Sequence, residues 1–162
     1  MNWYAPHVYV IPEDDADRQL ADGFVLHHAV NETRIQVVPP AGGWPHVLKT
    51  FRDEYVRKLR DYPLAHVVML IDFDGQYESR RAAFEVETPH DLGARVFVVG
   101  ARQAPEALRN ALRKSFEEIG TSLAGECRAG EAALWGHEQL EQNAPDLQRL
   151  IEAVKPILFG PA

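Results

Sequence analysis

Four mainly apolar runs, each five residues long and rich in valine or isoleucine, stand out along the chain. They occupy residues 7–11, 34–38, 67–71 and 95–99. A parallel strand that is buried on both faces loses the alternation of apolar and polar residues that marks a strand with one wet face. The runs therefore predict parallel strands, and the third run, VVMLI, is the most apolar and is expected at the centre of the sheet.

The segments between these runs carry apolar residues at intervals of three and four, which is the spacing of the buried face of a helix. They predict helices over about residues 13–28, 44–59, 77–86 and 105–119, and a further helix near residues 144–154. Pro105 is suited to the first turn of the fourth helix, and Gly120 is expected to end that helix.

Strands and helices that alternate with short connections are typical of a parallel sheet covered by helices. The sequence therefore predicts an α/β fold, with a single domain built on a mainly parallel, Rossmann-like four-stranded sheet that has helices on both faces. We expect residues 7–120 to form this core and residues 121–162 to form a C-terminal helical extension packed on it.

The composition limits the partners of the protein. A length of 162 residues suits one hydrophobic core, and 46% hydrophobic with 25% charged residues is an ordinary globular composition. The formal net charge of −7 opposes the approach of a nucleic-acid backbone. Any contact with nucleic acid is therefore expected to need a partner protein or an oligomer such as a homodimer.

The cysteine content and the apolar segments bear on the cellular compartment. Cys127 is the only cysteine, so an internal disulfide and a Cys-x-x-Cys metal cage are both excluded. No apolar run approaches the roughly 18 residues needed to span a bilayer, and the first residues do not have the pattern of a signal peptide. We expect a cytoplasmic protein with no membrane contact.

Acidic residues follow two of the predicted strands. Glu13 comes one proline after the first strand, and Asp72 and Asp74 follow the third. The carboxyl ends of parallel strands meet at one edge of the sheet, so these three carboxylates are expected within reach of one ion, and Mg²⁺ or Mn²⁺ is the implied cofactor. The alternative interpretation is that these three are helix caps or solvated loop residues, which would also account for Asp14, Asp15 and Asp17.

Basic residues lie close to these acidic motifs in the sequence. Lys49 follows the Gly42-Gly43 turn, and Arg80 and Arg81 follow the Asp-x-Asp motif at the start of a predicted helix. Each is a candidate for binding a phosphate group. The alternative is that all three belong to a solvated helix face.

The order of these motifs resembles the Toprim domain of topoisomerases, primases and overcoming-lysogenization-defect nucleases. A glutamate follows the first strand, a Gly-Gly turn follows the second, and an Asp-x-Asp follows the third, over about residues 7–119. The resemblance implies phosphodiester chemistry on nucleic acid, with Glu13 as the general acid/base and Asp72 and Asp74 as the metal-binding pair. Asp14 stands near the position where the family usually has a glycine.

Two other functions remain open from the sequence. The run that ends in Asp72-Phe73-Asp74-Gly75 also resembles the first motif of haloacid dehalogenase-type phosphatases, which implies Asp72 as nucleophile, Asp74 as general acid and a later lysine such as Lys114. That resemblance gives Glu13 no role. The third hypothesis is a non-catalytic interaction module whose contact surface surrounds Trp135.

Overall fold

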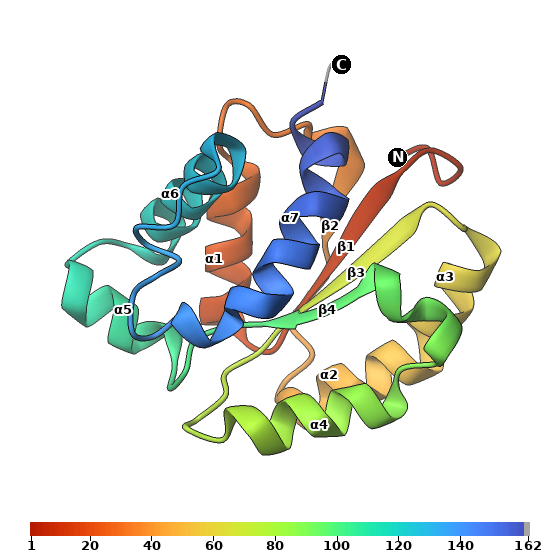
Figure 1. Ribbon diagram of the computed structural model, residues 1–162, viewed down its shortest axis with the longest axis horizontal. Coiled ribbons are helices and arrows are strands. Elements are labelled where there is room, and N and C mark those ends of the chain that lie inside the picture. The colour runs from red at the N-terminus through yellow and green to blue at the C-terminus, as the bar shows by residue number, and fades with distance from the viewer. Residues whose placement is uncertain (161–162) are drawn as a thin grey trace.

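The strands within residues 1–160, the part of the chain that the computed structural model describes, form one parallel sheet (Figure 1). Its order is β2-β1-β3-β4, and all three neighbouring pairs are parallel. The strands are β1 (His7–Pro12), β2 (Ile35–Val37), β3 (Ala65–Leu70) and β4 (Val96–Val99). The four predicted strands are confirmed, and the predicted proximity of the first and third strands holds, because β1 and β3 are neighbours.

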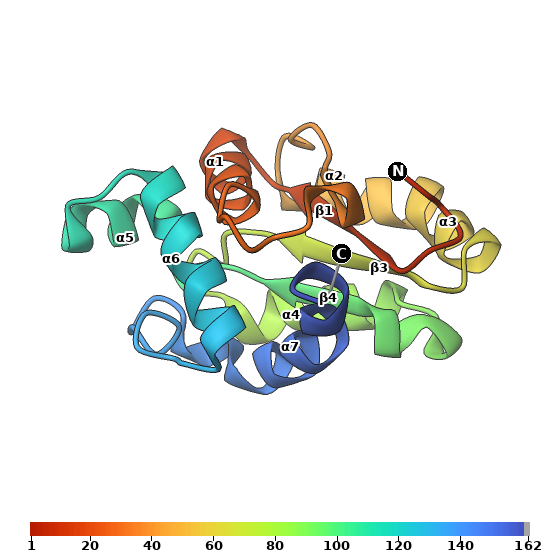
Figure 2. The same cartoon turned by 90° about the horizontal axis from the view of Figure 1, so that it is seen from above.

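Helices cover both faces of the sheet, as predicted for the α/β fold (Figures 1 and 2). Strand residues alternate between the two faces, so that Val67 and Met69 of β3 enter one core while Val68 enters the other. The first core is shared with α2 (Trp44–Thr50), α3 (Val56–Asp61) and α4 (Tyr77–Glu87). The second is shared with α1 (Asp15–Val25), α6 (Phe116–Ala129) and α7 (Ala144–Leu158).

The helix predicted over about residues 105–119 is two helices, α5 (Pro105–Leu112) and α6. Arg113 ends α5 in the left-handed conformation, with φ of 54°. Ser115 then begins α6 with a capping box, in which its hydroxyl accepts a hydrogen bond from the Glu118 backbone and its own backbone donates to the Glu118 carboxylate. The prediction of one helix was wrong because the helix breaks between Arg113 and Ser115, where these caps provide hydrogen bonds for the backbone groups at the two helix ends.

Gly120 does not end a helix, contrary to the prediction, but lies within α6 where that helix crosses α1. A Cβ atom at this position would lie 2.0 Å from the carbonyl oxygen of Leu20. Glycine is therefore required by the close approach of two helix backbones. The predicted boundary between residues 120 and 121 falls inside α6, so this helix belongs partly to the predicted core and partly to the predicted extension.

Two further helical segments differ slightly from prediction. The first helix ends at Val25 rather than near residue 28, and the second, predicted over about residues 44–59, is continuous through a π-helical turn, Phe51–Tyr55, between α2 and α3. Short 3₁₀ helices occur at Glu32–Arg34, His90–Arg95 and Glu141–Asn143. None of the helices described in residues 1–160 is both long and apolar enough to cross a membrane.

The segment before α7 is fixed to the end of β4. Asn143, fully buried, accepts a hydrogen bond from the Gly100 backbone N–H and donates one to the Gly100 carbonyl oxygen. On α7 itself, the buried carboxylate of Asp146 accepts two hydrogen bonds from Arg81 of α4, at 2.8 and 3.0 Å. This ion pair joins the two helical layers, so the C-terminal helix is part of the single domain.

Candidate metal centre

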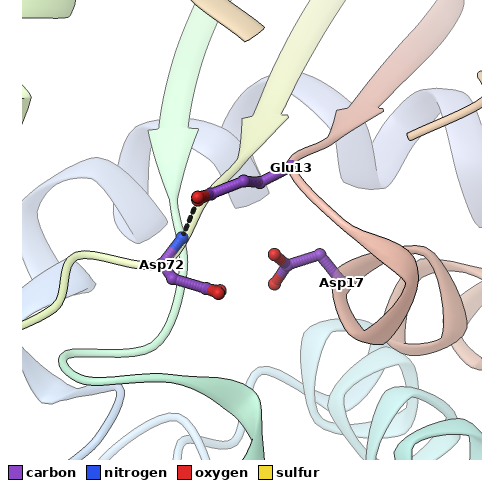
Figure 3. Close-up of side chains that lie close together, drawn as sticks. All are labelled: Glu13, Asp17 and Asp72. Carbon is purple, nitrogen blue, oxygen red and sulfur yellow. Dashed lines mark hydrogen bonds between the residues drawn. The ribbon is translucent and has the colours of Figure 1, made fainter. Parts of the chain in front are cut away.

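Three buried carboxylates converge at the carboxyl ends of β1 and β3. Glu13 follows β1, Asp72 follows β3, and Asp17 lies in the first turn of α1 (Figure 3). One carboxylate oxygen from each residue lies within 4.8 Å of the others. We refer to these three residues as the acidic triad.

The backbone around Glu13 fixes its position. Its N–H donates to the Leu70 carbonyl oxygen at 2.9 Å, which continues the pairing of β1 with β3. Its own carbonyl oxygen accepts hydrogen bonds from Gly42 and Gly43, whose φ angles of 88° and 117° favour glycine. Its Oε2 atom accepts a hydrogen bond of 2.6 Å from the backbone N–H of Asp72. The Gly-Gly turn seen in the sequence therefore holds the glutamate in place.

Asp17 was interpreted from the sequence as a solvated or capping residue, and the structure contradicts this. Its side chain is fully buried, and the capping role belongs to Asp14, whose carboxylate accepts a hydrogen bond of 3.0 Å from the Asp17 backbone. The sequence did contain a signal. Asp17, Leu20 and Phe24 have the helical spacing of one face, so Asp17 falls on the apolar stripe that α1 buries.

The carboxylates of Asp17 and Asp72 face each other (Figure 3), and within residues 1–160 neither forms a salt bridge, because Arg80 pairs with Asp74 instead. Three of their oxygens, Oδ1 and Oδ2 of Asp17 and Oδ1 of Asp72, are buried. No N–H or hydroxyl group in the part of the chain that the structure describes donates a hydrogen bond to them, and we call these oxygens orphaned. Buried polar atoms without partners are uncommon because desolvation is costly. These three oxygens therefore lie in a place suited to a ligand.

The environment makes ionisation of the triad unfavourable. Burial raises the pKa of Asp72 to about 7 against the opposing effect of a side-chain hydrogen bond with Asp17, and the nearby charges of Asp14 and Glu13 add to the rise. Burial, followed by the charge of Asp72, raises the pKa of Asp17 well above its ordinary value. Burial also raises the pKa of Glu13, against the opposing effect of the hydrogen bond from the Asp72 backbone.

Two things relieve the repulsion among such carboxylates: a shared proton or a bound cation. Carboxylate oxygens are the ligands preferred by hard divalent cations, and the three orphaned oxygens of the triad have no other partner among residues 1–160. The triad thus has the donor atoms and the spacing to hold a metal ion.

Asp74 does not join the triad, although the sequence placed it beside Asp72. The prediction assumed an extended backbone after β3, but Asp74 has φ of 47° and the chain turns at this residue. Phe73 does point to the opposite face, into the core with α2 and α4, as expected. The exposed carboxylate of Asp74 instead pairs with Arg80 at 2.6 Å.

The three predicted phosphate-binding residues lie in different places. Arg80 is adjacent to the triad, since it donates to the carbonyl oxygen of Asp72 at 2.5 Å and lies 5.3 Å from the ring centre of Trp44. Arg81 pairs with Asp146 of α7 and not with a residue of the triad. Lys49 is exposed and lies 3.7 Å from Asp53 on the same helical segment. Of the three, only Arg80 contacts a residue of the triad.

The residues of the alternative hypotheses lie elsewhere. Lys114 is exposed in the turn between α5 and α6, and within residues 1–160 no lysine forms an ion pair with Asp72. Trp135 is half-buried, packs against the core below α6 and α7, and donates its indole N–H to the Leu123 carbonyl oxygen at 3.3 Å. Its ring therefore contributes to the interior packing.

Comparisons with models of protein families, with curated proteins and with solved structures found no match to this chain.

Proposed function

We propose that the acidic triad binds Mg²⁺ or Mn²⁺ and that the protein, alone or in a complex, uses this ion to cleave phosphodiester bonds of nucleic acid, as the Toprim-like order of its motifs implies. The observation that carries the proposal is the convergence of three buried carboxylates with orphaned oxygens at one edge of the sheet. A structural ion pair would explain buried carboxylates, but Arg80, which contacts the Asp72 backbone, forms its salt bridge with Asp74 and not with a carboxylate of the triad.

In this proposal, Asp17 and Asp72 hold the ion and Glu13 serves both as a ligand and as a general acid/base. A bound divalent ion neutralises charge that develops on phosphate oxygens. Glu13 is suited to proton transfer because burial raises its pKa, and a general acid/base works best when its pKa is nearer to the pH of the solution. One of its oxygens is fixed by the Asp72 backbone, which leaves the other for the ion or for a proton.

Arg80 is the residue best placed to bind the phosphate group beside the ion. Its side chain is held by the Asp72 carbonyl oxygen, by Asp74 and by the Trp44 ring, so that the guanidinium stays next to the triad. Asp74 neutralises Arg80 in this arrangement, and a substrate phosphate would compete with Asp74 for the same guanidinium.

The proposal is tested by incubating the purified protein with supercoiled DNA, linear DNA, single-stranded DNA and RNA in Mg²⁺ and in Mn²⁺. Glu13→Gln, Asp17→Asn and Asp72→Asn remove the triad carboxylates one at a time. Each should slow cleavage by about 100-fold or more, since both ion binding and proton transfer contribute at least that much. Glu138→Gln, an exposed residue remote in sequence from the triad, is the matched control and should cleave like the native protein.

Equal cleavage by the native protein and the three triad variants would mean that a contaminant is responsible. Hydrolysis of a generic phosphate monoester that depends on Asp72 but not on Glu13 would replace the proposal with the phosphatase function. If no substrate is cut and no ion binds, the triad is not a metal centre and the proposal fails.

A further inference from the structure

A cavity of about 100 Å³ lies on the other side of the sheet from α2 and α4. It is bounded by the sheet, by α1 and α6 on one side, and by α7 on the other. Most of the side chains that line it expose less than a tenth of their surface. The cavity is close to the acidic triad. Two of its lining residues show this: Leu20 shares a face of α1 with Asp17, and Leu70 shares a side of the sheet with Asp72.

The lining of the cavity is almost wholly apolar. It consists mainly of valine, leucine and isoleucine side chains, among them Val10, Val68, Leu147 and Leu150. The two side chains with polar atoms do not change this. The indole N–H of Trp135 already donates to a carbonyl oxygen, and Cys127 is a buried thiol whose pKa burial raises to about 11, so it is neutral.

The size and chemistry of the cavity restrict what can occupy it. The cavity is partly open, but a buried water needs two to four polar partners, so water inside this apolar lining is held poorly. An ion is excluded for the same reason, and a peptide segment is too large for the volume. An empty cavity lowers stability in proportion to its volume, so a molecule that fills it is bound favourably.

We propose that this cavity is a binding site for a small apolar molecule, a hydrocarbon or an aromatic ring no larger than about benzene. A dry cavity of about 150 Å³ lined by similar side chains binds benzene and xenon, and the present cavity is somewhat smaller. The site is independent of the proposed metal ion, since it contains no residue of the triad.

The test uses xenon and benzene as probes on the full-length protein. Methyl resonances of Val68, Leu150 and Val154 should shift on addition of either probe, whereas those of Val47, Leu59 and Leu92, in the core on the opposite face, should not. Benzene at about ten times its dissociation constant should raise the melting temperature by about 2–5 °C.

Two variants fill the cavity to different extents. Ala21→Leu adds three carbons from α1, and Val68→Ile adds one from the floor of the cavity. Ala21→Leu should abolish both responses and Val68→Ile should weaken them. Ala82→Leu on the exposed side of α4 is the control and should respond like the native protein.

Absence of methyl shifts in the native protein would overturn the proposal, as would shifts of equal size in both cores or an unchanged response in Ala21→Leu. If Ala21→Leu does not fold, the location of the shifts in the native protein and the weaker response of Val68→Ile decide the outcome.

Discussion

Asp17 and Asp146 are both buried aspartates, but their surroundings are opposite. Asp146 is 3% exposed; burial opposes its ionisation, but hydrogen bonds and charge from Arg81 and Arg149 outweigh burial and lower its pKa. Asp17 has no basic partner within residues 1–160, and its pKa is raised. A buried charge without a partner destabilises a fold unless something else binds it. Function is therefore the better explanation for Asp17, and structure for Asp146.

The first prediction compares these two residues. At pH 8 without metal, Asp17→Asn should stabilise the protein by about 1–2 kcal/mol, because burial and the charge of Asp72 disfavour ionisation of the Asp17 carboxyl, and asparagine keeps its shape without an ionisable group. Asp146→Asn should instead destabilise it by a similar amount, because Arg81 loses its charged partner. Urea unfolding measures both changes. Added Mn²⁺ should stabilise the native protein and Asp146→Asn, but not Asp17→Asn. Destabilisation by Asp17→Asn without metal would contradict this account.

The second prediction concerns pH and follows from Asp72. Its pKa rises from 3.8 to about 7 in the folded protein, so between these values the folded state binds a proton that the unfolded state releases. Stability is therefore highest at the acidic end of this range and falls as the pH rises. In EDTA, the free energy of unfolding should fall by about 2 kcal/mol between pH 5 and pH 8.

The matched variants separate this effect from other titrations. Asp72→Asn should reduce the decline, and the raised pKa values of Asp17 and Glu13 account for what remains. Asp146→Asn should keep the full decline, because the lowered pKa of Asp146 leaves that residue ionised throughout the range. Saturating Mn²⁺ should also reduce the decline, since the ion replaces the proton as the compensating charge. A stability that rises from pH 5 to pH 8 in EDTA would be inconsistent with the buried carboxylates described.

How far the sequence predicts the site depends on the local backbone. Glu13 and Asp72 were predicted to meet because each directly follows a buried strand, and the structure brings them together through the backbone of Asp72. Asp74 was predicted to face the ion on the assumption of an extended backbone, but the chain turns at this residue and redirects its side chain. The sequence contained a signal for the turn, because an Asp-Gly pair is typical of turns. Asp17 was missed because acidic residues in the first turn of a helix are usually solvated.

At the scale of elements, the close contact between α1 and α6 depends on small residues. Thr121, next to Gly120, donates its hydroxyl to the carbonyl oxygen of Gly23 on α1 at 2.8 Å, so the two helix backbones are joined directly. The sequence shows Gly120 but not the partner helix, and isolated glycines in a helical pattern are easily interpreted as ends. The break before α6 was visible in principle, because Ser115 and Glu118 have the spacing of a capping box.

The third prediction uses two glycines of α6 that differ in their neighbours. Gly120→Ala should destabilise the protein by about 2–3 kcal/mol, because its Cβ would lie 2.0 Å from the Leu20 carbonyl oxygen and must push α1 away. Gly125→Ala is the control: its Cβ would lie 3.5 Å from the His27 ring, an ordinary contact. This variant should be as stable as the native protein or more stable by up to about 1 kcal/mol. Urea unfolding that shows the same change for both would contradict the close approach.

At the scale of the whole molecule, the predicted architecture is confirmed because it rests on long-range regularities. Parallel strands buried on both faces need apolar residues throughout, and crossover helices need one apolar face, so both patterns are readable without knowing the partners. The division at residue 120 stays a prediction, and the boundary itself falls within α6, which packs on α1 near the start of the chain. Contacts so distant in sequence leave no local signal.

The last prediction concerns the charge of the whole chain. With a net charge of −7, the isolated protein should bind a fluorescent DNA duplex more weakly than about 100 µM at 150 mM salt, as judged by anisotropy, because repulsion from the phosphate backbone acts before any local contact forms. Replacing two exposed acidic residues, Glu131→Lys with Glu138→Lys, should strengthen this binding if repulsion is the limit, and the gain should disappear at high salt. Glu131→Gln with Glu138→Gln should give a smaller gain. Low-micromolar binding by the unmodified chain at this salt concentration would show that a local basic surface overcomes the net charge, and that no partner is needed for contact with nucleic acid.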